Sequence, residues 1–185
     1  MSRVFGEIAQ IAYITRRFDE TLKFFLQTGI GPWYVAKNRM MKDVDYLGTR
    51  VDIEMSVGVA NSGSLQLEVI EPTNGVRSVY TDWLDRHPTE LFVQHVSSWP
   101  VDYPATEKRV LEAGFKPIMT GRLSAGPFGY YIHPDKPEFI FEMSELSAAR
   151  RYVWETVARG AADWDGKDPY RAWPVLSKTG SATVA

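Results

Sequence analysis

The strongest constraint on the fold is an internal repeat, because the same succession of one strand, one helix and three strands occurs twice. Apolar periodicity places the strands and helix of the first copy, in order, at residues 8–15, 19–28, from 32, 50–60 and 63–71. The same signals place the second copy at residues 91–98, 103–113, 116–123, 128–133 and 138–144. Glycines follow both helices, at Gly29 and Gly114, and provide their stop signals. The sequence therefore predicts two βαβββ modules.

The segments outside the repeat divide the chain further. Residues 76–86 (VRSVYTDWLDR) predict a connecting helix, and residues 146–159 predict a helix after the second module. We therefore expect a first module over 1–75, a connecting helix within 76–90, a second module over 91–145 and a C-terminal helix and tail over 146–185. The end of that tail, from Ser177, is expected to be loosely held.

Composition excludes several classes of protein. The absence of cysteine excludes disulfides and thiolate ligands, so any metal must be bound by nitrogen and oxygen atoms. A net charge of −2 gives no field that attracts nucleic acid or an anionic membrane. No apolar run approaches the roughly 20 residues that cross a bilayer. We expect a cytoplasmic protein without nucleic-acid or membrane partners, and the pairs Arg16-Arg17 and Arg150-Arg151 are expected to be solvated.

Aromatic residues make up 13% of the chain and include six tryptophans. This content indicates either a large apolar cavity or an aromatic interface, such as that of a homodimer. The chain has no GxGxxG, P-loop or GxSxG motif in the required context, which argues against nucleotide-binding and α/β-hydrolase functions.

The last strand of each module carries a glutamate between apolar neighbours. In LQLEVIEP (65–72), Leu67 and Val69 share one face, whereas Gln66 and Glu68 share the other. The second copy, FIFEMSE, places Glu142 at the matching position. A single glutamate of this kind is normally solvated. Its recurrence in a repeated unit indicates instead that both carboxylates face one interior.

The tandem modules, the opening GEIAQIAYITRRFDETLKFFLQTGIGPW and the strand LQLEVIEP resemble the vicinal oxygen chelate superfamily of glyoxalases, bleomycin-resistance proteins and extradiol dioxygenases. The resemblance covers residues 7 to 145 and is closer to the glyoxalase-like and methylmalonyl-CoA-epimerase-like branches. It implies an α+β fold in which the two modules form one cupped eight-stranded sheet around one cavity with one divalent metal ion. Carried over by position, the implied ligands are Gln10, Glu68, His95 and Glu142.

This ligand set restricts the metal and the chemistry. One amide, two carboxylates and one imidazole suit Zn, Ni, Co, Mn or Mg, whereas extradiol dioxygenases require two histidines and one carboxylate. Gln10 departs from the histidine that is commonest in the family. Two alternatives remain open: Gln94 pairs with Gln10 and turns His95 away, or the protein binds a ligand without any metal.

The resemblance implies a metal-dependent isomerase, epimerase or lyase that abstracts a proton next to a carbonyl through a metal-bound enediolate. Glu142 is the better candidate for the base and Glu68 the alternative. The substrate is a small molecule, with the aromatic content favouring an apolar or aromatic one. The alternative function is a metal-free, bleomycin-resistance-like protein that sequesters a hydrophobic small molecule.

Further residues are candidates for substrate binding. Tyr130 and His133 would position a substrate oxygen if their strand lines the cavity, and Glu54 would add a second acid or base. Trp33 and Trp154 are expected in the core, with a ligand wall as their secondary role.

Overall fold

The computed structural model describes residues 1–88, 91–176 and 182–184. The helices in this part are α1 (Phe18–Gln27), α2 (Val79–Arg86), α3 (Tyr103–Glu112) and α4 (Ala148–Ala162). The strands of the same residues are β1 (Gln10–Ile14), β2 (Trp33–Tyr46), β3 (Thr49–Ser62), β4 (Leu65–Pro72), β5 (Val93–Ser98), β6 (Lys116–Leu123), β7 (Gly126–His133), β8 (Lys136–Ser144), β9 (Tyr170–Ala172), β10 (Pro174–Leu176) and β11 (Ala182–Val184). The expected βαβββ order occurs twice, as β1-α1-β2-β3-β4 and β5-α3-β6-β7-β8. The module boundaries themselves stay predictions.

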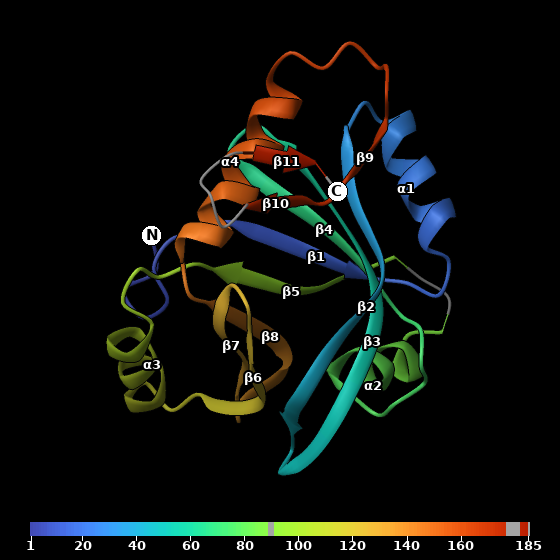
Figure 1. Cartoon of the computed structure of the whole chain (residues 1–185). Helices are drawn as coiled ribbons and strands as arrows, with labels where there is room; N and C mark the ends of the chain where they lie inside the picture. Colours follow the sequence, from blue (N-terminus) through green and yellow to red (C-terminus); the bar gives the residue numbers. More distant parts are fainter. Residues whose placement is uncertain (89–90, 177–181, 185) are drawn as a thin grey trace.

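Eight strands of the described chain form one closed mixed sheet, which confirms the expected α+β fold (Figure 1). Their order is β3-β4-β1-β5-β8-β7-β6-β2, and β2 pairs again with β3 to complete the ring. The antiparallel pair β1–β5 joins the two modules on one side. On the other side, β2 and β6 pair only through Asp45–Thr120 and Tyr46–Met119. The cup is therefore closed by a short seam, and β9 adds to β2 from outside the ring.

Period-2 alternation in both modules separates a helix-facing side of the sheet from an inner side. Leu67 and Val69 of β4 pack with the α1 residues Leu22 and Phe25. In the same way, Phe141 and Met143 of β8 pack with residues of α3. Because successive side chains of a strand point to opposite faces, Glu68 and Glu142 must face the inside of the barrel.

The two ends of the barrel are covered by different elements. In Figure 1, α2 lies below β1 and β5, whereas α4 and β10 lie above them. The apolar side of α2 joins a core of strand residues that fills its end of the barrel, and it contributes Val79, Tyr80, Trp83 and Leu84. The opposite end, beneath α4 and β10, keeps a cavity. None of the helices in the described residues is long and apolar enough to cross a membrane.

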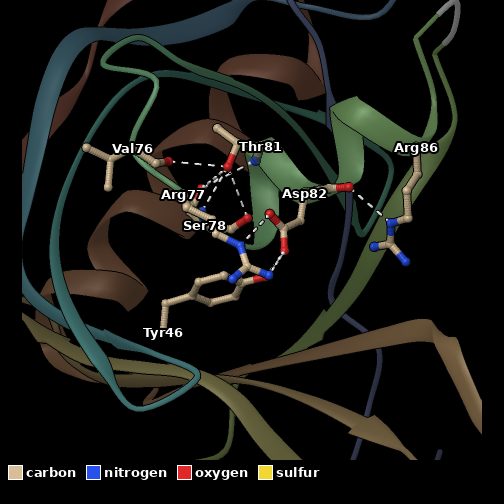
Figure 2. A network of polar contacts seen from close by, with 7 residues as sticks. All are labelled: Tyr46, Val76, Arg77, Ser78, Thr81, Asp82 and Arg86. Atoms are coloured by element: carbon tan, nitrogen blue, oxygen red, sulfur yellow. Dashed lines mark hydrogen bonds and ion pairs between the residues drawn. The ribbon is translucent and has the colours of Figure 1, made fainter.

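A polar network fixes α2 to the seam of the barrel (Figure 2). The Tyr46 hydroxyl of β2 donates to Asp82 of α2 at 2.8 Å, and Arg77 donates two hydrogen bonds to the same carboxylate at 3.2 and 3.0 Å. Ser78 and Thr81 form a capping box at the start of the helix. Burial by itself raises the pKa of Asp82, but the hydrogen bonds from Arg77 and Tyr46 outweigh it and lower the pKa.

Most of the tail expected to be loose lies outside the described residues. Of the segment from Ser177 onward, only Ala182–Val184 is described, as β11 paired with β10. The residues before Ser177 form α4, β9 and β10: α4 packs on β3, β9 pairs with β2, and β10 packs on α4.

We expect Tyr46→Phe to lower the free energy of unfolding by about 1 to 2 kcal/mol, because it removes one hydrogen bond to a carboxylate at the barrel seam. Urea denaturation at neutral pH measures the change. Tyr170→Phe is the matched control, since Tyr170 is 45% exposed. Equal stabilities of the two variants would contradict the role of the network in holding α2 to β2.

Candidate metal centre

Three side chains that could hold a metal ion meet inside the barrel, from strands β4, β5 and β8. His95 Nε2 of β5 lies 3.1 Å from Glu142 Oε2 of β8 and 3.7 Å from Glu68 Oε2 of β4. One ligand atom from each residue lies within 4.8 Å of the other two. The sheet register places Ala12 of β1 opposite both Glu68 and His95. Because alanine carries only a methyl group, the longer side chains on either side can approach each other above it.

Neighbouring polar groups orient two of these three side chains. The Gln94 side-chain oxygen contacts His95 Nδ1, which leaves Nε2 directed at the carboxylates. Gln94 and His95 are adjacent in sequence, and a bulge opposite Ala12 and Tyr13 disturbs the alternation of β5 here. Ser144 donates a hydrogen bond of 2.6 Å to Glu142 Oε1. Partners of this kind fix the tautomer and rotamer of metal ligands.

Burial and mutual charge shift the pKa values of the three groups. Burial alone would lower the pKa of His95, but hydrogen bonds and charges from Glu142 and Glu68 raise it to about 9. Burial raises the pKa of Glu68, and the negative charge of Glu142 adds to this effect. The pKa of Glu142 is lowered, because the hydrogen bond and charge of His95 outweigh its burial.

This donor set fits a divalent cation. Two carboxylates and an imidazole nitrogen suit borderline or hard ions such as Zn or Mn. The two carboxylates are 14% and 9% exposed, so their negative charges are held close together with little solvation. The described residues provide a single histidine here, which does not match the two-histidine set of an iron dioxygenase.

Gln10 lies on the same inner face of β1 as Ala12, two residues away. Its amide nitrogen donates to the side-chain oxygen of Gln66 at 2.9 Å, and both glutamines line the same cavity as Glu68 and Glu142. Its role as a fourth ligand stays a prediction. The alternative in which Gln94 pairs with Gln10 and displaces His95 is wrong, because Gln94 contacts His95 and supports its orientation.

The carboxylates open into a cavity of about 410 Å³ under α4 and β10. Barrel residues form its floor, and the C-terminal segment forms its roof. The lining includes Gln10, Arg39, Val59, Gln66, Glu68, Trp99, Leu123, Ser124, Ala125, Glu142, Ala149, Arg150, Val153, Trp154, Trp173, Pro174, Val175 and Leu176. The lining thus combines the two carboxylates of the candidate centre with two glutamines, two arginines and a largely apolar remainder.

A family model of the glyoxalase/bleomycin resistance protein/dioxygenase superfamily matches residues 9–131. The chain belongs to this superfamily. Among solved structures, methylmalonyl-CoA epimerase from Mycobacterium tuberculosis is 14% identical, with a TM-score of 0.56 over 82% of this chain and 94% of the epimerase. A Streptomyces coelicolor epimerase variant in complex with 2-nitronate-propionyl-CoA is 19% identical, with a TM-score of 0.53 over 78% and 99% of the two chains. These similarities concern the fold. A search among curated proteins finds no significant match.

The four residues that the sequence predicts to bind substrate lie in different parts of the structure. Tyr130 packs against His95, with ring centroids 5.0 Å apart, and its hydroxyl is hydrogen-bonded to that of Tyr80 at 2.8 Å. Trp33 is fully buried in the core beneath α1. Glu54 on β3 is outside the cavity lining, and His133 packs against Phe115 near Gly114. Only Tyr130 is therefore close to the candidate centre.

The sequence analysis did not identify two arginines that line the cavity. The expectation that Arg150 is solvated is wrong, because α4 packs over the barrel and turns this side chain into the cavity. Neither a motif nor the family resemblance indicated Arg39. A bulge in β2 pairs Ala36 with Val57 and Arg39 with Met55, so one extra residue places Arg39 on the same face as Ala36. Asn38, within the bulge, has a φ of 54°, a left-handed conformation that asparagine adopts more readily than most residues.

We expect the apparent affinity for a divalent ion to rise by about tenfold per pH unit between pH 7 and pH 9 and then to level off. His95 must lose a proton to bind the ion, and its pKa is raised to about 9, so binding competes with protonation below that pH. Competition with a chromophoric chelator at several pH values measures the affinity. His133→Asn should leave the profile unchanged, and a flat wild-type profile would exclude His95 as a ligand.

Proposed function

We propose that this protein is a metal-dependent isomerase or epimerase, with a lyase reaction as the related possibility, that removes a proton from a carbon next to a carbonyl. The observation that carries the proposal is the convergence of Glu68, His95 and Glu142 at the end of a roofed cavity. A divalent ion bound by these residues would polarise the carbonyl and lower the pKa of the neighbouring C–H group.

The residues around this centre suit separate roles. His95 is fully buried and is oriented by Gln94, so it serves as a fixed ligand. Glu142 is fixed as well, because Ser144 holds one of its oxygens while the other faces His95. Within the described residues, the contact given for Glu68 is the one at 3.7 Å from His95, which is a weaker anchor. We therefore assign proton transfer to Glu68, the alternative base of the sequence analysis, and ligand binding to Glu142.

The structural neighbours support this reaction class without identifying the substrate. They are methylmalonyl-CoA epimerases, and one of them is described in complex with 2-nitronate-propionyl-CoA. An epimerase must remove and return a proton at one carbon, which is the step proposed for Glu68. The low identity, 14% and 19%, means that this support rests on a shared fold.

A metal-free ligand-binding function is the second candidate, and one feature of the centre favours it. Protonated His95 lies between the two carboxylates and can neutralise part of their charge without any ion. In that case the cavity would sequester a small molecule and no proton transfer would follow.

Metal content separates the two functions. After purification without chelator, or after reconstitution, we expect about one divalent ion per chain by elemental analysis. Glu142→Gln should weaken the binding of that ion by about tenfold or more, since it removes an anchored ligand. Glu54→Gln is the matched control, because Glu54 is outside the cavity lining. Failure of the wild-type protein to retain or take up an ion would rule out the metal-dependent enzyme.

Glu68→Gln tests the division of roles. We expect it to retain more metal than Glu142→Gln, because Glu68 is the less anchored of the two carboxylates. A larger loss of metal in Glu68→Gln would reverse the assignment and make Glu142 the mobile base.

A further inference from the structure

Three buried hydrogen-bond donors around the cavity have no partner within the described residues. They are the indole nitrogens of Trp99 and Trp154 and the Nη2 atom of Arg150. A buried polar group without a partner destabilises the fold, so such groups are uncommon in native proteins. All three atoms donate and none accepts. Their presence on one cavity points to a ligand that supplies acceptor atoms.

Arg150 is held in position while part of its guanidinium group remains unpaired. Its Nε donates to the backbone oxygen of Glu145 at 2.9 Å, and Ser147 caps the helix on which it lies. This bond fixes the plane of the guanidinium group and leaves Nη2 for another partner. Buried arginines normally pair with carboxylates, yet the described residues provide no ion pair to Arg150.

Arg39 brings a second guanidinium group to the same cavity. It lies 4.9 Å from the ring centroid of Trp173, which is a cation–π distance, and it forms no ion pair within the described chain. Burial lowers the pKa of both arginines, and each is also affected by the charge of Glu68. Both cations are therefore partly desolvated and near the candidate metal centre.

The charges of the cavity favour an anionic ligand. Glu68 and Glu142 balance Arg39 and Arg150 in number. Both carboxylates contact His95, however, and within the described residues neither forms an ion pair with Arg39 or Arg150, so the two arginine charges are left for a ligand. Charges in such a weakly solvated space interact more strongly than in water, so a ligand with negative charge is preferred over a neutral one.

The remaining walls of the cavity indicate the shape and polarity of the rest of that ligand. Trp99 and Trp154 are arranged edge to face with ring centroids 5.8 Å apart, and Trp173 and Val153 extend the apolar lining. The volume of about 410 Å³ lies in the range of small-molecule sites, which runs from about 300 to 1,000 Å³. The enclosed part of the ligand is therefore compact, and its flat or apolar surface contacts tryptophan rings.

We propose that the cavity binds an organic carboxylate with an aromatic or similarly flat apolar body. The carboxylate accepts hydrogen bonds from Arg150 and from the indole groups, and Arg39 adds a second positive charge. This inference names the class of substrate for the candidate centre. It rests on the proposed function only where it takes the bound carboxylate to be the substrate of a reaction. The binding itself depends on residues from α4 and β2 that are not metal ligands.

Binding of matched acids and amides tests the proposal. Benzoate, phenylacetate and 2-naphthoate are compared with their primary amides on chelator-treated protein, by calorimetry and by quenching of tryptophan fluorescence. We expect at least one acid to bind about tenfold or more tightly than its amide, because a hydrogen bond to a charged group contributes more than one to a neutral group. Equal affinities for every pair, or no binding of any acid, would overturn the proposal.

Variants of α4 assign the effect to one side chain. Arg150→Gln should weaken binding of the preferred acid by about tenfold to a hundredfold and leave the amide unchanged. Arg151→Gln is the matched control, because the neighbouring Arg151 is exposed. Arg150→Lys, which keeps the charge but loses the planar fork, should give an intermediate loss. An unchanged affinity in a folded Arg150→Gln protein would overturn the role of Arg150.

Metal analysis of the same samples keeps this proposal separate from the proposed function. Selective acid binding by a protein that takes up no metal would support the carboxylate site and reject the metal-dependent enzyme. Metal uptake without selectivity for acids would support the metal-dependent enzyme and reject the carboxylate site. Arg150→Gln is expected to keep its metal content, since Arg150 is not a ligand, and thermal melting checks that the variant is folded.

Discussion

The burial of two carboxylates beside one imidazole is the constraint on which the centre depends. Moving a charged group from water into a protein costs several kcal/mol unless opposite charges and hydrogen bonds accompany it. Glu68 and Glu142 meet this requirement through His95, Ser144 and the arginines of the cavity. The pKa of His95 is raised and that of Glu142 is lowered for the same reason. A divalent ion would satisfy the same charges more completely, which links the electrostatics of the site to its proposed chemistry.

The two parts of the chain make different contributions to the site. The superfamily modules supply a closed barrel whose inner face carries three residues that could hold a metal ion. The segment after the second module supplies α4 and β10, which roof the cavity and add Arg150, Trp154 and Trp173 to its lining. Since members of one fold perform many reactions, residues outside the repeated modules are a reasonable place for the substrate preference of this chain to reside.

The repeat in the sequence predicted the two βαβββ modules, and the family resemblance implied that they form one cupped sheet with Glu68, His95 and Glu142 at one site. Alternation in β4 and β8 assigned Glu68 and Glu142 to an interior, and the structure confirms that interior. The position of His95 was implied by the family resemblance, which places a ligand on the first strand of the second module. Trp33 packs against α1 on the helix-facing side of the sheet, and Glu54 and His133 are outside the cavity lining, because nothing in the alternation of their strands tied these residues to the site as the repeat tied the two glutamates.

The sequence by itself determined the two modules and the inner face of their strands, because these features follow from local periodicity and from its repetition. Only the tertiary structure decided that Arg39 and Arg150 enter the cavity. A bulge in β2 shifts Arg39 by one position relative to strict alternation, and the packing of α4 over the barrel buries Arg150. Both effects arise from contacts between distant segments, whose free energy no local pattern records.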